Sequence, residues 1–138
     1  MIAFKVVDKR TRHGSNWTMF YRQSEEKNVK GRLAKIKKKI PNIFPRYKKN
    51  RIINSLNESP GIYCFSSIYS AKAFIYTHAL ERYTKIIKVR GFKEKNPSNL
   101  AIYGCGFYIE NLLDFKNKEL KELSYSGVIC FESVLVLE

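Results

Sequence analysis

The sequence predicts one α+β domain over residues 1–138, with a mixed, mostly antiparallel sheet and about three helices. A length of 138 residues is typical of a single domain. Hydrophobic residues make up 44% of the chain and include nine Phe and nine Tyr, enough for a buried core and too many for a disordered chain. Short strand-like segments and segments of helical periodicity follow one another in the order β-β-α-β-α-β-β-α-β.

The first two strands are expected to pair as a hairpin. Residues 2–7 are mostly apolar and predict a strand. Residues 8–16 are polar and contain Gly14 and Ser15, which indicates a turn. The aromatic segment 17–21 then predicts a second strand.

A basic helix is expected to follow. Ser24 is a favourable N-cap residue, and the two acids after it stabilise the positive end of a helix dipole. Apolar residues recur every three or four positions and form one narrow stripe: Val29, Leu33, Ile36 and Ile40. Pro41 ends the helix, and residues 42–57 predict a loop.

The rest of the chain is expected to supply four strands and two helices. The strands are 62–65, 84–89, 100–103 and 128–137; the helices are 109–123 and a segment from Ser66 or Ser67 to about Arg82. Residues 91–99 are polar and predict a turn. The last strand is the most apolar, so we expect it in the core, with Leu135 as a core residue.

Positive charge is concentrated in the first part of the chain. Residues 1–57 contain 16 basic and 3 acidic side chains, whereas residues 58–138 contain 10 and 9. No acid occurs from Lys27 to Asn57, although ordinary surfaces mix both signs. A concentrated positive field attracts polyanions, and the block at about 24–57 is expected to be a basic helix-loop insertion that binds one.

The residues expected to contact nucleic acid all belong to this block. They are Lys30, Arg32, Lys35, Lys37, Lys38, Lys39, Arg46, Tyr47, Lys48, Lys49 and Arg51. Lys outnumbers Arg in the helix, which favours point contacts with backbone phosphate over bidentate reading of bases. Tyr47 and Phe44 would stack on unpaired bases. An acidic surface of a nucleic-acid-handling protein would satisfy the same charges, and this alternative stays open.

Other classes of protein receive little support from the sequence. No apolar stretch is long enough to cross a membrane, and no apolar region follows the N-terminus as in a signal peptide. Cys64, Cys105 and Cys130 form no CxxC pair, so we expect reduced thiols in a cytoplasmic protein. His13 and His78 lie far from any cysteine in sequence, so no metal site is expected.

One set of short motifs suggests an enzyme. It consists of His13-Gly14-Ser15, Gly61-Ile62-Tyr63-Cys64-Phe65 and Glu132. In its His–Tyr–Glu order this set resembles ADP-ribosyltransferases of the poly(ADP-ribose) polymerase type. In that family the His binds the nicotinamide ribose of NAD, the Tyr stacks on nicotinamide, and the Glu stabilises the developing positive charge. The resemblance implies an NAD-dependent transferase with His13, Tyr63 and Glu132 as catalytic residues.

The same three residues also have structural interpretations. His13 would be a turn residue, Tyr63 a core aromatic, and Glu132 an ion-pairing or edge carboxylate. The transferase requires a carboxylate in a medium of low dielectric constant. Glu132 would meet this requirement through an alternating face shared with Val128, Cys130, Val134 and Val136.

A second resemblance covers more of the chain. The segments 2–7, 62–74, 83–92 and 127–137 look like those of a loose group of small, uncharacterised proteins of phages and other mobile elements. The group supplies no activity to carry over, but the resemblance implies interference with a host nucleic-acid or defence machinery as the context of an accessory or anti-defence protein. From the basic block we expect a non-catalytic protein that binds nucleic acid or a nucleic-acid-handling complex without a cofactor. The NAD-dependent transferase is the alternative.

Overall fold

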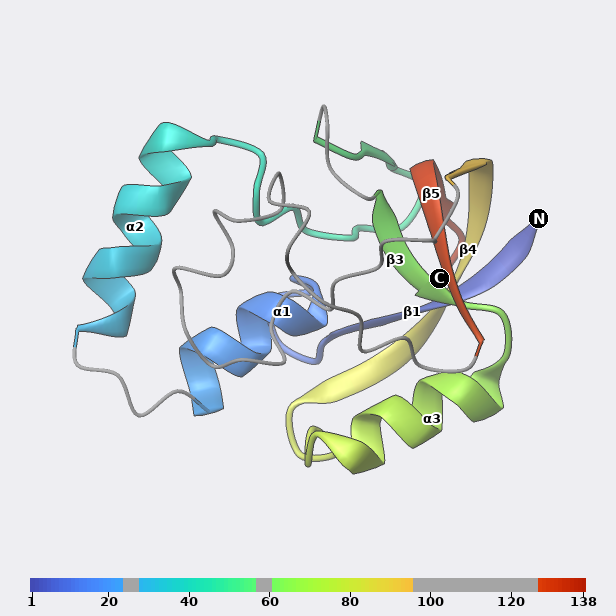
Figure 1. Ribbon diagram of the computed structural model, residues 1–138, viewed down its shortest axis with the longest axis horizontal. Helices are drawn as coiled ribbons and strands as arrows, with labels where there is room; N and C mark the ends of the chain where they lie inside the picture. Colours follow the sequence, from blue (N-terminus) through green and yellow to red (C-terminus); the bar gives the residue numbers. More distant parts are fainter. Residues whose placement is uncertain (24–27, 57–60, 96–126) are drawn as a thin grey trace.

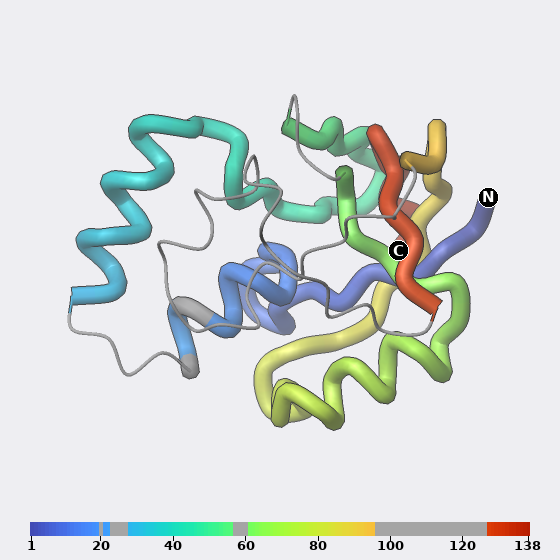
Figure 2. The backbone as a smooth tube through the Cα atoms, viewed as in Figure 1, coloured from blue at the N-terminus to red at the C-terminus, as the bar shows by residue number. Residues whose placement is uncertain are grey.

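The computed structural model describes residues 1–23, 28–56, 61–95 and 127–138, and Figures 1 and 2 show their arrangement. The elements are β1 (Ile2–Asp8), α1 (Ser15–Thr18), the π-helical turn η1 (Met19–Gln23), α2 (Val29–Lys39), β2 (Ile52–Asn54), β3 (Ile62–Phe65), α3 (Ile68–Thr77), β4 (Thr84–Lys95) and β5 (Val128–Val136). This is the predicted α+β domain.

The described strands close into a small barrel in which every pairing is antiparallel. β1 pairs with β3 on one side and with β4 on the other, and β5 also pairs with both β3 and β4. β2 pairs with residues 133–135 of β5, just beyond Phe131, the partner of the first residue of β3. The prediction of a mostly antiparallel sheet is therefore confirmed. Barrel closure leaves few open strand edges.

Hydrophobic residues pack in three clusters. The first fills the barrel and includes Ala3, Val7, Ile87, Val134 and Val136. The second lies between the outer face of the sheet and the helices α3 and η1, and it includes Phe65, Phe74 and Met19. The third is formed by the apolar stripe of α2, where Leu33 and Ile36 are buried against Phe44. Each helix thus covers its own part of the molecule, with α2 at one end and α3 near the other (Figure 1).

β5 is the central strand, as predicted, but the core residue is not the one that the sequence indicated. Val134 and Val136 are fully buried, whereas Leu135 between them is half-buried. Leu135 faces outward because side chains of a strand alternate between its two faces.

The alternation of β5 breaks at Glu132. Phe131 and Val134 both belong to the barrel cluster although they are three residues apart. On the adjacent strand Lys93 has a left-handed φ of 55°, and its Nζ lies 3.0 Å from Oε2 of Glu132. The break in the alternation of β5 thus lies beside a kink of β4 at Lys93. The prediction that Glu132 shares one face with Val134 and Val136 was therefore wrong. β4 also continues through residues 91–95, where a turn was expected.

The segment 17–21 is helical, so the predicted N-terminal hairpin was also wrong. Residues 15–18 form α1 and residues 19–23 form η1. The helical segment places Trp17 and Tyr21, which are four residues apart, on one side, and His13 lies just before it. Their rings stack, and Met19 is buried against the second cluster. Local aromatic stacking and burial together outweigh the strand preference of these residues.

The two remaining described helices agree with the sequence in part. Ser67 caps α3 and accepts a 3.1 Å hydrogen bond from the backbone N of Ser70. α3 ends at Thr77 instead of Arg82 because Ala79 adopts a left-handed φ of 53°. The expected strand 100–103, the expected helix 109–123 and the expected start of the basic helix at Ser24 lie outside the described residues. No helix in the described ranges is long and apolar enough to span a bilayer.

Candidate nucleic-acid interface

The basic side chains of α2 and of the loop after it point into solvent. Nine of them are exposed: Lys30, Lys35, Lys37, Lys38, Lys39, Arg46, Lys48, Lys49 and Arg51. Arg32 is half-buried. The apolar stripe of α2 holds Leu33 and Ile36 against the molecule, so the lysines occupy the outer face of the helix. We call these ten residues the basic face.

Hydrogen bonds fix the basic loop against the turn that follows β1. Arg12 Nε donates to the carbonyl of Tyr47 over 2.7 Å, and the Tyr47 backbone N donates to the carbonyl of Arg12 over 2.9 Å. His13 and Arg46 form an isolated β-bridge. The turn, the loop and α2 therefore belong to one surface.

The two aromatic residues of the loop are not on that surface. Tyr47 is 5% exposed and packs inside the barrel, and Phe44 is 7% exposed beneath α2. The ammonium of Lys5 lies 5.0 Å from the centre of the Tyr47 ring. Burial raises the pKa of Tyr47 far above its usual value. The prediction that Tyr47 and Phe44 stack on unpaired bases was wrong, because their side chains form part of the core.

A different group of aromatic residues lies beside the basic face. The rings of His13 and Trp17 stack with a centroid separation of 4.2 Å, and those of Trp17 and Tyr21 with a separation of 4.5 Å. Trp17 also packs against the third cluster, under α2. Lys30 of α2 places its ammonium 5.4 Å from the centre of the Tyr21 ring. We call these three stacked rings the aromatic stack.

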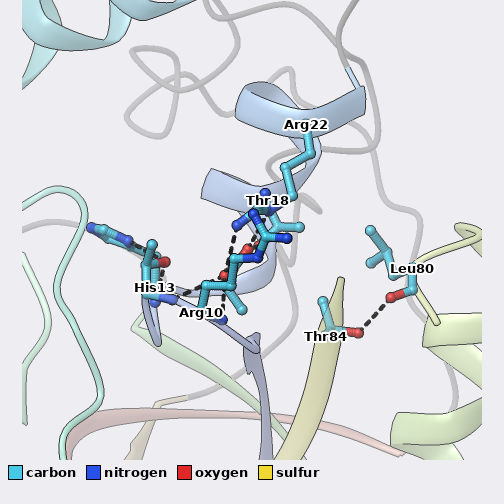
Figure 3. Close-up of polar contacts among 8 residues, drawn as sticks. Arg10, His13, Thr18, Arg22, Leu80 and Thr84 are labelled. Atoms are coloured by element: carbon cyan, nitrogen blue, oxygen red, sulfur yellow. Dashed lines mark hydrogen bonds and ion pairs between the residues drawn. The ribbon is translucent and has the colours of Figure 1, made fainter. Parts of the chain in front are cut away.

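Asp8 anchors the segment that carries the aromatic stack, and Figure 3 shows Thr18 and Arg22 of that segment. Its fully buried carboxylate accepts hydrogen bonds from Arg22 Nε at 2.7 Å and from Thr18 Oγ1 at 3.0 Å. The backbone N atoms of Arg10 and Thr11 donate to it as well. Burial alone would raise the pKa of Asp8, but the hydrogen bonds, chiefly from Arg22, lower it well below its usual value. The charged carboxylate thus ties β1 to η1.

His13 is neutral near pH 7 and closes one end of the stack. Its Nδ1 lies 2.7 Å from Thr11 Oγ1. Burial lowers the pKa of His13 to about 4, helped by the positive charges of Arg46 and Lys37 and opposed by Asp8. The influence of Lys37 and Arg46 shows that α2 and the basic loop lie within electrostatic reach of the stack.

The three residues of the transferase hypothesis each have a structural role of their own. His13 stacks on Trp17 in the turn, and Tyr63 packs at the edge of the second cluster with its ring 6.1 Å from that of Phe65. The side chain of Glu132 is 46% exposed and forms an ion pair with Lys93. Its carboxylate is therefore not held in the medium of low dielectric constant that the transferase requires. These positions match the structural interpretations given above.

The barrel interior contains an unusual lysine. Lys5 is 6% exposed, and its Nζ donates a 2.7 Å hydrogen bond to the carbonyl of Tyr63. Burial lowers its pKa, and the nearby thiols Cys64 and Cys130 oppose this shift. Burial raises the pKa of Cys64 to about 11 and that of Cys130 to about 12, so both remain protonated. Cys105 lies outside the described residues, and among those described no three His, Cys, Asp or Glu side chains cluster as metal ligands.

The aromatic stack was not predicted from the sequence, because the segment 17–21 was expected to be a strand. The spacing of four between Trp17 and Tyr21 was the available signal, since residues four apart share one face of a helix. The lysines, by contrast, lie on the surface as expected.

No protein-family model matches this chain, and the comparisons with curated proteins and with solved structures also find no match. The two resemblances drawn from short motifs stay predictions. The indications of function that remain are the geometry and charge of the site.

Proposed function

We propose that this protein binds nucleic acid through the basic face and catalyses no reaction. The observation that carries the proposal is the exposure of nine basic side chains from a segment without acids, all on α2 and the loop fixed beside it. Lysine ammonium groups neutralise backbone phosphates and release their counterions. The role of a cytoplasmic accessory or anti-defence protein of a phage or mobile element is part of the same proposal.

Salt dependence tests the proposal first. If the basic face contacts phosphates, the affinity for a short oligonucleotide falls as salt rises, with a log–log slope of roughly one per phosphate contacted. The affinity should be measured at several salt concentrations by fluorescence anisotropy. Absence of binding at low salt would refute the proposal and leave an acidic protein surface as the partner to test.

A charge-matched pair of variants locates the interface. Replacing Lys35, Lys37, Lys38 and Lys39 by Gln removes four charges from the basic face and keeps long side chains that form helices well. Relief of like-charge repulsion offsets the lost attraction to the helix C-terminus, so we expect little change in melting temperature. The control variant replaces the exposed Lys72, Lys85, Lys88 and Arg90 by Gln.

The two variants have the same net charge, so a difference in their affinity for the oligonucleotide shows which surface binds it. The basic-face variant should lose roughly three to four units of salt slope. The control should keep most of the wild-type affinity. Equal losses in both variants would show that net charge, and not the basic face, determines binding.

A further inference from the structure

The aromatic stack has one closed end and one open end. His13 at one end is 6% exposed and lies under the loop that carries Arg46. Tyr21 at the other end is 36% exposed. Trp17 covers one face of the Tyr21 ring with an interplanar angle of 12°, so only the opposite face is available. A flat ligand would therefore continue the stack on Tyr21.

The open face of Tyr21 lies next to a cation of the basic face. Lys30 holds its ammonium over the Tyr21 ring at 5.4 Å from the centroid, and its side chain is exposed. Because Trp17 occupies one face of Tyr21, the ammonium lies over the other. A cation on a π-face at an exposed site contributes only about 0.5–1 kcal/mol, so a stacking ligand can displace it.

Packing and hydrogen bonds hold the stack in place before any ligand binds. Trp17 packs against the hydrophobic cluster beneath α2, and the guanidinium of Arg22 lies 5.8 Å from its ring centre. Arg22 is itself held by two hydrogen bonds to Asp8. A ligand on Tyr21 therefore orders few side chains, which lowers the entropic cost of binding.

We propose that the ligand is single-stranded nucleic acid, with one unpaired base stacked on the open face of Tyr21. This inference rests on the proposed function, because the basic face must hold the phosphates on either side of that base. Base stacking on aromatic rings tolerates any sequence, since every base has a π-face. Lys30, displaced from the ring, pairs with an adjoining phosphate. A duplex buries its base faces and gains nothing from Tyr21.

Trp17 provides a direct signal, because it is the only tryptophan of the chain. Its fluorescence is expected to change when a base extends the stack on Tyr21. The titration uses three DNA probes of one length and at one salt concentration: a single strand, the same strand with abasic sites throughout, and a duplex. Wild-type protein should bind the single strand about tenfold more tightly than the abasic strand.

Variants of Tyr21 separate stacking from charge. Tyr21→Leu should weaken binding of the single strand about tenfold and leave binding of the abasic strand and the duplex unchanged. Tyr21→Phe should restore single-strand binding. The control is Tyr76→Leu, which removes another exposed tyrosine, 80% exposed on α3, and should change none of the affinities.

The outcomes distinguish this inference from the proposed function. Equal wild-type affinity for the abasic and normal strands, with steep salt dependence for both, would overturn the stacking inference and leave phosphate binding intact. Absence of salt-dependent binding to any probe would overturn both. The comparison of probes uses wild-type protein, so it stays decisive even if Tyr21→Leu folds poorly.

Discussion

Acidification from pH 7.5 to pH 5 is expected to destabilise the fold through His13. Burial, and then the charges of Arg46 and Lys37, lower the pKa of His13 from its usual 6.5 to about 4 in the folded state. Below pH 6.5 the unfolded chain therefore binds a proton that the folded protein does not bind until about pH 4. Stability rises with pH wherever the unfolded state holds more protons, so this contribution is complete above pH 6.5 and is lost between pH 6.5 and 4.

The two pKa values set the magnitude. At pH 5 and with a pKa of 6.5, the ratio of protonated to neutral imidazole is about 30 to 1. With a pKa of about 4, the same ratio is about 1 to 10. The resulting loss in the free energy of unfolding is about 2 kcal/mol. Most carboxylates are still charged at pH 5, so they contribute little to this difference.

Urea unfolding followed by circular dichroism at the two pH values measures the loss. The His13→Phe variant keeps a ring on Trp17 and cannot titrate, so its stability should change by about 2 kcal/mol less between the two pH values than that of the wild type. Burial also lowers the pKa of His78, and His78→Gln is the control that keeps the contribution of His13. A pH dependence that survives in His13→Phe and disappears in His78→Gln would refute the assignment.

Two further predictions concern stability and are measured by the same urea unfolding. Asp8→Asn should destabilise the fold by about 3 kcal/mol, because it leaves the Arg22 guanidinium beside a neutral side chain. A loss under about 1 kcal/mol in the free energy of unfolding would show that the network around Asp8 is not an anchor. Gly91→Ala should cost about 1–3 kcal/mol, since the new Cβ would lie 2.4 Å from the Phe131 ring. Gly31→Ala is the matched control in α2, and it should stabilise by up to about 1 kcal/mol because the Cβ would meet only the side chain of exposed Asn28. Equal effects of the two alanine variants would contradict this packing.

The elements predicted correctly are those whose pattern is local. The apolar runs of β1 and β3 and the stripe of Leu33 and Ile36 in α2 each fit only one type of element. The segment 17–21 fits two types of element, because its residues favour a strand while the spacing of its aromatic residues fits a helix. The contacts that decide between them come from Asp8 and from α2, which the local pattern does not contain.

Of the candidate site, only the surface position of its charged side chains could be predicted from the sequence. Lysines such as Lys35 and Lys38 are expected on the surface because burying an ammonium is costly, and they lie there. The place of Tyr47 depends on hydrogen bonds between its backbone and Arg12, far away in sequence. The kink at Lys93 depends on a left-handed backbone that no residue preference indicates. Both features depend on the folded structure around the residue, so they could not be predicted from the sequence.

The pairing of β5 with β2, β3 and β4 also determines when the barrel can form. β5 is the last described strand to leave the ribosome, and its partners lie between about 35 and 85 residues earlier in the chain. Contacts of such separation slow folding, and an antiparallel barrel of this kind is expected to fold in milliseconds to seconds. Until β5 arrives, β3 and β4 each expose an unpaired edge that other chains can join. A nascent chain arrested before residue 128 should therefore be sensitive to proteases and prone to association, even though the whole basic face has already been synthesised.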